Sequence, residues 1–347
     1  MANVGAGMST ILLTGGAGYI GSHIALLLIE RGHDVVVFDN FCNAQPESLK
    51  RVEQLAGAEI DVIKGDIRNV DAIDAVFESR EIDGSIHLAG LKAVGDSVTD
   101  PMTYYDNNVV GSLRLIEAAR RRGSDHILFS SSATVYGEPH YLPMDEKHPL
   151  NPVSPYGKNK RMVEMIMEDI GKSPGGLSYA ILRYFNPIGA HPSGRIGEDP
   201  SGIPNNLLPY IAQVAIGLRP ALNVWGDDYD TPDGTGIRDY IHVMDLARAH
   251  VLALEHIMKT GSKITLNLGT GQGSSVMDVV DAFKSASGKD IPLNISPRRP
   301  GDIASYYADS KFAKSLIGWE AEYDVLKMCQ DHWRWQSQNP KGYDSGE

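Results

Sequence analysis

The chain has 347 residues, of which 42% are hydrophobic and 22% are charged, and its formal net charge at pH 7 is -12. This length allows two lobes with sizeable cores, while the acidic balance repels phosphate backbones and argues against a nucleic-acid partner. The longest apolar run near the start covers residues 24–29. A membrane-spanning helix needs roughly 20 such residues, so we expect no membrane segment.

Cysteine usage bears on the compartment. Cys42 and Cys329 stand far apart in the sequence and lack the spacing of metal ligands. We therefore expect neither a disulfide framework nor a metal site, and we predict a reducing compartment, the cytoplasm.

Short apolar runs alternate with amphipathic stretches through the first half of the chain. The sequence predicts strands at residues 10–14, 34–38, 60–64, 85–89 and 127–131, and helices at residues 19–31, 70–79, 102–122 and 155–170. Runs this continuous in apolar residues are typical of strands buried on both faces of a parallel sheet. Their alternation with helices predicts an α/β fold with a doubly wound parallel sheet of the Rossmann type.

A glycine-rich segment, GGAGYIG at residues 15–21, follows the first predicted strand and opens the first helix. Gly15 permits a tight turn, Gly18 lets a pyrophosphate approach the helix N-terminus, and Gly21 lets the helix pack closely on the sheet. Asp39 follows the second strand at the spacing that places a carboxylate on the adenosine ribose. A plain strand–helix turn is the alternative interpretation. Asp39 repels a 2′-phosphate and Asn40 is neutral, so the pattern favours NAD over NADP.

A second glycine cluster, at residues 269–273, follows a predicted strand at residues 264–268 and precedes a helix. It lacks an acidic residue at the required distance, so we interpret it as an ordinary strand–helix turn.

After residue 184 the chain changes to loops rich in proline and glycine between shorter elements. This change indicates a smaller, mixed α/β lobe that binds the substrate. We expect residues 9–185 to form the NAD-binding lobe, with later segments near 230–260 returning to it. Residues 186–343 then form mainly the substrate lobe, and residues 1–8 form a short extension.

Tyr156 and Lys160 form a YxxxK pattern on a predicted helix, where positions four apart share a face. The same pattern occurs twice more, at Tyr307 and Tyr323, without this context. Ser132 directly follows the predicted strand at residues 127–131 and precedes Tyr156 by 24 residues. Ligands in such folds bind beyond the carboxyl ends of the strands, so we expect Ser132, Tyr156 and Lys160 to converge. A cap or turn hydroxyl is the alternative interpretation of Ser132.

These residue types suit the oxidation of an alcohol. A free tyrosine has a pKa near 10, and a nearby cation lowers such a pKa by roughly 1–3 units. Lys160 and a positive nicotinamide ring would therefore help Tyr156 to act as a base near neutral pH. Ser132 can bind the same oxygen and pass the proton.

At this point the chain resembles the UDP-galactose 4-epimerases (UDP-glucose 4-epimerases), which belong to the extended short-chain dehydrogenase/reductases. The segments that carry the resemblance are AGLKAVG at 89–95, YYDNN at 104–108, SSSATVYG at 130–137, RYFNPIGAHPSG at 183–194, GIPNNLLPY at 202–210 and GTGIRDYIHVMD at 234–245. The resemblance runs from about residue 11 to residue 343.

The resemblance implies two sets of binding residues. For NAD they are Gly15, Gly18, Tyr19, Ile20, Gly21, Asp39, Asn40, Asn43, Asp66, Ile67, Leu88, Ala89, Gly90, Lys92, Asn107, Ser132, Tyr156, Lys160 and Phe185. For the nucleotide sugar they are Lys92, Ser132, Tyr156, Asn186, Asn206, Leu207, Asn223, Trp225, Arg238, Arg299, Asp302 and Tyr306. Guanidinium groups such as Arg238 and Arg299 match phosphate oxygens, and Trp225 offers a flat face to a base.

By the same resemblance, the chain interconverts UDP-glucose and UDP-galactose in galactose metabolism. Tyr156 takes the proton of the sugar 4-hydroxyl while hydride passes from C4 to bound NAD. The transient 4-keto sugar turns, and NADH returns the hydride to its opposite face. Tyr306 lies where a bulky residue would exclude N-acetyl sugars, and a homodimer is expected.

Three alternatives to this assignment stay open: an epimerase of another UDP-sugar, a nucleotide-sugar 4,6-dehydratase and, in a different class, a non-catalytic NAD sensor. The dehydratase reaction needs an added acid/base pair, and the chain has Ala133 and Thr134 where such relatives carry Asp and Glu. A sensor has no need to keep Ser132, Tyr156 and Lys160 together.

Overall fold

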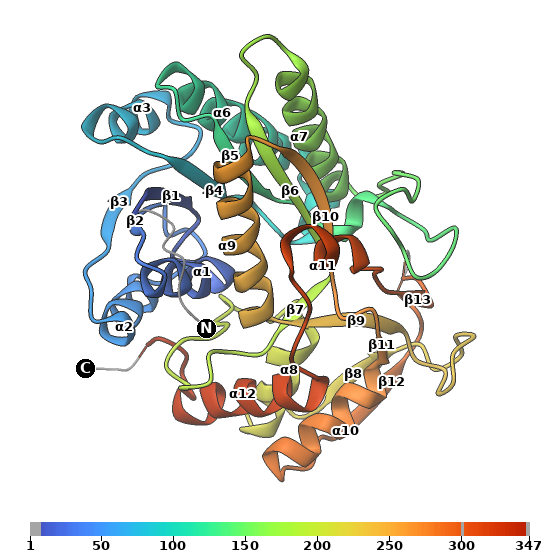
Figure 1. The fold of residues 1–347 in the computed structure, drawn as a ribbon. Coiled ribbons are helices and arrows are strands. Elements are labelled where there is room, and N and C mark those ends of the chain that lie inside the picture. Colours follow the sequence, from blue (N-terminus) through green and yellow to red (C-terminus); the bar gives the residue numbers. More distant parts are fainter. Residues whose placement is uncertain (1–7, 300–301, 345–347) are drawn as a thin grey trace.

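The computed structural model describes residues 8–299 and 302–344, so residues 1–7 of the predicted extension lie outside the described part. Seven strands form one parallel sheet in the order β10-β6-β5-β4-β1-β2-β3 (Figure 1). Their bounds are β1 (Thr10–Thr14), β2 (Asp34–Asp39), β3 (Asp61–Lys64), β4 (Gly84–His87), β5 (His126–Ser130), β6 (Ser178–Tyr184) and β10 (Lys263–Leu268). The order runs outward from β1 in both directions, which confirms the doubly wound α/β fold.

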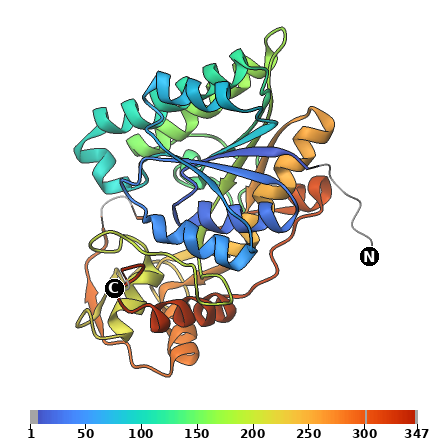
Figure 2. The ribbon, with the colours of Figure 1, turned by 90° about the vertical axis from the view of Figure 1, so that its left-hand side faces the viewer.

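Helices cover both faces of this sheet (Figure 2). One layer consists of α1 (Tyr19–Glu30), α2 (Pro46–Ala56) and α9 (Val243–Thr260), and the other of α3 (Val70–Ser79), α6 (Gly111–Arg121) and α7 (Pro155–Lys172). Alternate strand residues serve opposite layers. Ile11 and Leu13 pack in the core with α1 and α9, whereas Leu12 packs in the core with α3 and α6. No helix in the described part of the chain is long and apolar enough to cross a membrane.

The predicted strands and helices are present, with ends shifted by one or two residues, apart from three differences. The strand at residues 60–64 is β3, an edge strand whose side chains are mostly exposed, so it is not buried on both faces. We did not predict α2, α4 (Val94–Thr99) or β6. The two helices are short, and β6 ends at Tyr184, directly before the region that we interpreted as a change of composition.

The helix predicted at residues 102–122 is divided into three segments. These are α5 (Pro101–Tyr104), the π-helix η1 (Tyr105–Val110) and α6. Gly111 opens α6 against Ile67, and a Cβ at Gly111 would lie 2.7 Å from the Ile67 Cδ1 atom. The wider π turn also brings Asn107 and Asn108 into buried positions together. Single π turns of this kind recur at functional sites.

The second lobe lies below the sheet in both views (Figures 1 and 2). Its strands are β7 (Asn186–Ile188), β9 (Ile237–His242), β11 (Gly273–Ser275) and β13 (Ser305–Tyr306), with β8 (Leu222–Trp225) and β12 (Leu293–Ser296) as a separate pair. Its helices are α8 (Leu207–Ala215), α10 (Val276–Ser287) and α12 (Val325–Gln338). These helices share a core with β7, β8 and β9. The helix α11 (Lys311–Ile317) packs near β10, and the 3-10 helix η2 (Ala133–Val135) follows β5.

The chain crosses between the lobes more than once. The strand β10 is an outer strand of the large sheet, and α9 packs against α1, so residues 243–268 lie in the first lobe. The boundaries that we expected for the two lobes stay a prediction.

The glycine cluster at residues 269–273 is a turn, but it is followed by β11 and not directly by a helix. The backbone N–H groups of Thr270 and Gly271 donate to the carboxylate of Asp239, at 2.8 and 3.0 Å. Asp239 is fully buried, so this turn serves a carboxylate of the protein itself.

Candidate active site

The glycine-rich loop lies at the carboxyl end of β1, pressed against the next strand connection. Gly15 has a φ of 73°, and a Cβ at this position would lie 2.7 Å from the Ala89 nitrogen. A Cβ on Gly21 would collide with the Gly15 carbonyl oxygen. Gly18 precedes α1, whose N-terminus has no side-chain cap. The helix therefore presents its first N–H groups and the positive end of its dipole, which is how such loops hold a pyrophosphate.

Asp39 ends β2 beside this loop. Its carboxylate accepts hydrogen bonds from the Ala17 nitrogen at 3.0 Å and the Phe41 nitrogen at 2.9 Å. Burial raises the pKa of Asp39, and these backbone hydrogen bonds oppose that rise. The carboxylate thus lies at the loop, at the position expected for a ribose-binding acid. Asn43 lies in the exposed connection that follows.

Asp66 follows β3 and has partners that the sequence analysis missed. Arg68 donates to both of its oxygens at 2.9 Å, and Asn40 donates to one of them at 3.1 Å. The hydrogen bonds from Arg68 hold the pKa of Asp66 well below its usual range. Arg68 also reaches Asp106 at 3.1 Å, so it joins the β3 connection to η1. The sequence signal for this ion pair was the short spacing between Asp66 and Arg68, which we did not use.

The connection after β4 is held by Asn108, which we did not single out. Its amide accepts from the Leu91 nitrogen at 2.7 Å and donates to the Leu91 oxygen at 3.0 Å. The predicted residue, Asn107, is buried beside it on η1. The nitrogens of Leu88 and Ala89 both donate to the Thr14 carbonyl. This part of the predicted cofactor site is therefore fixed to β1 and η1.

The predicted catalytic residues come together at the end of β5. The Lys160 ammonium donates to the Ser130 carbonyl at 2.8 Å and lies 5.8 Å from the centre of the Tyr156 ring. Ser132 caps η2 by accepting from the Thr134 nitrogen at 3.2 Å, and its hydroxyl also hydrogen-bonds with Tyr156. Tyr156 and Lys160 are buried at 7% and 6% exposure, so this is a nearly dry site.

Local features of α7 explain why Tyr156 is placed so firmly. Ser154 caps the helix by accepting from the Gly157 nitrogen at 3.1 Å, and Pro155 occupies the first turn. A Cβ on Gly157 would lie 2.8 Å from the Thr134 carbonyl oxygen, so the start of the helix packs directly on η2.

Burial shifts both titrating groups away from the state that catalysis needs. It raises the pKa of Tyr156, and the hydrogen bond with Ser132 opposes this rise. It also lowers the pKa of Lys160 to about 8, against the attraction of Glu164. The expected depression of the Tyr156 pKa therefore requires more positive charge than the protein supplies alone.

Four of the predicted sugar-site residues, Trp225, Arg238, Arg299 and Asp302, form a chain of contacts near the start of β13. Arg299 donates to Asp302 at 2.9 Å and lies over the Trp225 ring, with 5.9 Å between its central carbon and the ring centre. Arg238 lies 3.9 Å from the other Asp302 oxygen. Asn223 hydrogen-bonds instead with Asn294 on the neighbouring strand, and Asn186 is exposed on β7.

Tyr306 joins the second lobe to the catalytic segment. Its hydroxyl donates to the Ala133 carbonyl, next to Ser132, and its ring centre lies 5.0 Å from that of Phe185. The bulky ring thus stands beside the predicted nicotinamide position, and this contact places it near the reacting groups.

A third group of contacts spans the two lobes. The carboxylate of Glu198 accepts from the Asn206 amide at 2.7 Å and lies 3.5 Å from the Lys92 ammonium. Asn206 precedes α8, and since its amide binds Glu198, the first N–H groups of α8 at Leu207 have no side-chain cap. Glu198 is buried and was missed, because nothing in its local sequence marks it.

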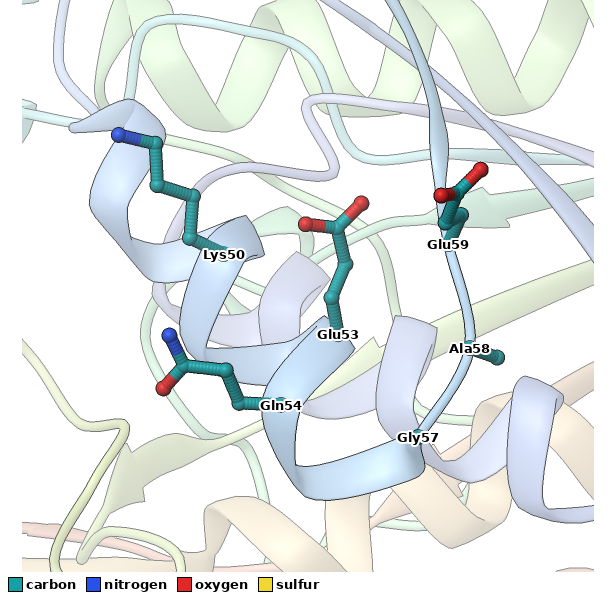
Figure 3. A pocket seen from close by; sticks show the side chains of 6 residues that line it. All are labelled: Lys50, Glu53, Gln54, Gly57, Ala58 and Glu59. Atoms are coloured by element: carbon teal, nitrogen blue, oxygen red, sulfur yellow. The ribbon is translucent and has the colours of Figure 1, made fainter.

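A surface hollow at the end of α2 lies apart from these residues (Figure 3). It is lined by Lys50, Glu53, Gln54, Gly57, Ala58 and Glu59. Glu53 accepts a hydrogen bond from the Ile60 nitrogen at 2.9 Å, so it has a structural task there. None of the predicted site residues lines this hollow.

Comparisons with known proteins agree with this geometry. A model of the NAD dependent epimerase/dehydratase family matches residues 11–269. The UDP-glucose 4-epimerase of Neisseria meningitidis serogroup A is 54% identical, over 97% of this chain and 100% of its own length. A structure of UDP-glucose 4-epimerase from Bifidobacterium longum in complex with NAD+ and UDP is similar with a TM-score of 0.92 and 47% identity, covering 96% of this chain and 100% of that one. Another, from Stenotrophomonas maltophila with bound NAD and formylated UDP-arabinopyranose, has a TM-score of 0.94 at 46% identity, covering 96% and 99%.

Proposed function

The chain belongs to the NAD dependent epimerase/dehydratase family, and from that premise we propose that the side chains gathered at the carboxyl edge of its sheet invert C4 of a UDP-hexose. The reaction is the reversible epimerisation of UDP-glucose and UDP-galactose, with NAD as the cofactor. The observation that carries the assignment of the reacting groups is the convergence of Ser132, Tyr156 and Lys160 beside the glycine-rich loop.

The cofactor site fits a dinucleotide without a 2′-phosphate. Gly15 and Gly21 have no room for a Cβ, the start of α1 has no side-chain cap, and Asp39 faces the loop. Asp39 would take the adenosine ribose, and the loop N–H groups would take the pyrophosphate. When bound, NAD supplies a hydride acceptor and donor for the C4 carbon.

Tyr156 is the base in this proposal. Its phenolate takes the proton of the 4-hydroxyl, and the phenol so formed later returns it, while Ser132 binds the same oxygens and aligns the sugar. Lys160 supplies a positive charge that favours the phenolate. Because the phenol and the ammonium are both buried, little water screens this attraction.

We also propose which residues bind each part of the nucleotide sugar. Arg238 and Arg299 would bind the diphosphate together with the uncapped N-terminus of α8, and Trp225 would cover the uracil. In the protein alone the two arginines are bound by Asp302, which keeps them oriented. The hexose must stay loosely held, because its 4-keto form has to present both faces.

A direct assay separates this function from its rivals. The 4,6-dehydratase reaction needs an acid/base pair near Ser132, but Ala133 is packed in a core and the Thr134 hydroxyl donates to Ser132. Incubation with UDP-galactose should produce UDP-glucose, while a 4-keto-6-deoxy product would indicate a dehydratase and no product would indicate a sensor. Turnover only of a UDP-pentose or of UDP-glucuronate would instead assign another UDP-sugar.

The retained cofactor gives a second test. Denatured protein should release about one NAD(H) per chain, because the chain carries one complete dinucleotide fingerprint. Release of NADP would overturn the role proposed for Asp39.

We further propose that the protein is a homodimer of the cytoplasm. An apolar surface supports the dimer: Val98 on α4, Met102 on α5, and Met162 and Met165 on α7 are 65%, 76%, 41% and 48% exposed. These helices contact one another, so the side chains lie on neighbouring elements. Apolar surfaces of this kind mark protein interfaces. The two cysteines are both free thiols, Cys42 exposed and Cys329 buried, as a reducing compartment allows.

A further inference from the structure

A buried carboxylate lies one helical turn beyond Lys160 on α7. Glu164 is fully buried, and its oxygens accept from the Ser131 hydroxyl at 2.6 Å and from Arg183 at 2.9 and 2.8 Å. Arg161 adds a fourth contact at 3.1 Å. A buried charge is tolerated only when it is paired and hydrogen-bonded in this way.

The strand β5 and the helix α7 bind each other in register around this carboxylate. The Ser130 carbonyl accepts from Lys160, and the Ser131 hydroxyl donates to Glu164. Ser132 then hydrogen-bonds with Tyr156. Three consecutive serines thus hold three residues of one helix face.

Arg183 extends this arrangement beyond α7. It donates to the Tyr136 hydroxyl at 3.2 Å, and Tyr136 donates to Asn267 at 2.6 Å. The network therefore ties α7 to β6, to the segment after η2 and to β10. Side chains in such a network have little freedom to move independently.

Lys160 needs a nearby anion if it is to stay charged. Burial lowers its pKa to about 8, and the Glu164 carboxylate acts against this shift. A group with a pKa this close to neutral pH changes its charge after a small change in its surroundings. Positions four apart on a helix are neighbours, so Glu164 is well placed to decide the charge of Lys160.

We propose that Glu164 is a positioning residue of the epimerase: its buried carboxylate fixes α7 to β5 through Ser131 and to β6 through Arg183, so that Lys160 stays in register with Tyr156 and has a negative charge one helical turn away. This inference rests on the roles proposed above for Tyr156 and Lys160.

The other ionisable groups around the pair allow its titration to be followed. They are Tyr156, Arg161 and Glu168 on α7, Tyr104 on α5, His87 on β4, Tyr136 after η2, and Tyr179, Arg183 and Tyr184 on β6. Burial lowers the pKa of His87 to about 3, so this side chain is neutral at neutral pH. Burial raises the pKa of Tyr104, Tyr136, Tyr179 and Tyr184, so these stay protonated. Lys160 is thus the group in this set that loses its proton just above neutral pH.

The test compares the pH dependence of kcat for Glu164→Gln, Glu164→Asp and the control Glu168→Gln. Active enzyme needs protonated Lys160, and loss of the carboxylate lowers the Lys160 pKa, so the alkaline limb of the E164Q profile should move to lower pH by roughly one unit. E164D keeps the charge and should retain the wild-type limb. Glu168 lies on the same helix and pairs with Arg161 at 2.7 Å, so E168Q makes the same chemical change without moving the limb.

The inference would be overturned if the pH profile of E164Q, like that of the control E168Q, superimposed on the wild-type profile after scaling. A merely structural role would lower the rate without moving the alkaline limb. A shift of the E164D limb equal to that of E164Q would overturn it as well. Thermal unfolding and NAD content are measured for each variant to confirm that it is folded and loaded. If E164Q cannot be purified, the double variant E164Q/R183Q also removes the buried guanidinium that E164Q leaves without its carboxylate, and it should shift the limb in the same direction by a smaller amount, because the lost cation offsets part of the lost anion.

Failure of the underlying assignment is recognised separately with Tyr156→Phe. An active Y156F enzyme would remove Tyr156 as the base, whatever the Glu164 variants do. An inactive Y156F enzyme combined with an unmoved E164Q limb would overturn the role of Glu164 alone.

Discussion

At the scale of single residues, Tyr156 illustrates a conflict between burial and chemistry. Burial strengthens the attraction between the phenolate and a cation, but it also raises the pKa of the phenol. Burial acts on Lys160 in the opposite direction, because it lowers the pKa of the ammonium group to about 8. The two groups therefore reach their reactive charge states only together, with the positive cofactor nearby.

The first prediction concerns this base. Tyr156→Phe removes the ionisable hydroxyl but keeps the ring, so the fold and the bound NAD should be retained. Loss of general-base help should lower kcat by about 10²–10⁴-fold. Turnover of UDP-galactose measures the effect, and a near-normal rate in the folded variant would rule out Tyr156 as the base.

The second prediction concerns substrate size. The Tyr306 ring lies beside Phe185 and is anchored by its hydroxyl to the Ala133 carbonyl, so it cannot move aside without losing that hydrogen bond. The wild type should therefore act on UDP-glucose and UDP-galactose and hardly at all on UDP-N-acetylglucosamine, since packed pockets resist overlap. Tyr306→Cys should open the site to N-acetyl sugars.

The control for this prediction is the adjacent tyrosine. Tyr307 packs near Gly273, so Tyr307→Cys should bring no gain with N-acetyl sugars. Efficient turnover of UDP-N-acetylgalactosamine by the wild type would contradict the size argument while leaving the epimerase assignment intact.

At the scale of secondary-structure elements, η1 decides the position of the connection after β4. A regular helix through residues 102–122 would rotate the residues beyond the π turn onto other faces. The π turn instead lets Asn108 bind both backbone groups of Leu91. The predicted cofactor residues that follow β4 are therefore held in place by a helix distortion farther along the chain.

The third prediction tests this contact. Asn108→Ala should lower the free energy of unfolding by about 1–3 kcal/mol, because it removes two hydrogen bonds and leaves the part-buried N–H and carbonyl groups of Leu91 without these partners. Denaturant unfolding measures this loss, and the NAD content of the purified protein should fall with it. Asn294→Ala is the control, since Asn294 is exposed on β12 and makes a single long hydrogen bond of 3.4 Å. Equal stability of the two variants would show that Asn108 does not hold the loop.

At the scale of the whole molecule, the exposed apolar side chains on α4, α5 and α7 come from residues 98–165, which precede the predicted substrate lobe in the sequence. The helix α7 belongs to the layer on the face of the sheet opposite α1 and α9 (Figure 2), and α4 and α5 pack against α7. Two copies that met through these three helices would bury the exposed apolar side chains.

The fourth prediction follows from that surface. The wild type should sediment as a dimer, and the double variant Val98→Asp with Met102→Asp should sediment as a monomer, because like charges in an apolar interface repel one another and lose their water without gaining partners. Leu218→Lys is the control, since Leu218 is 62% exposed in the second lobe. A monomeric wild type, or a dimer that survives the double variant, would contradict the proposal.

Local patterns in the sequence were enough for most strands of the sheet and for the predicted catalytic residues. Continuous apolar runs indicate strands, although the place of a strand in the sheet decides its burial, as the exposed edge strand β3 shows. Positions four apart on a helix must share a face, which placed Tyr156 and Lys160 together. The glycine pattern was equally local, because a positive φ at Gly15 and a close approach at Gly21 depend on a few adjacent residues. The sequence alone thus determined the fold class and predicted the catalytic centre.

The remaining contacts were decided by the path of the chain. Glu198 meets Lys92 across 106 residues, and Arg183 meets Glu164 across a helix and a strand. Tyr306 reaches Ala133 across 173 residues. No periodicity links such positions, because their distance depends on how the two lobes pack and not on local conformation. For the same reason Asn108, and not only its predicted neighbour Asn107, proved to hold the loop: the π turn that selects it forms where Gly111 packs against Ile67, a tertiary contact.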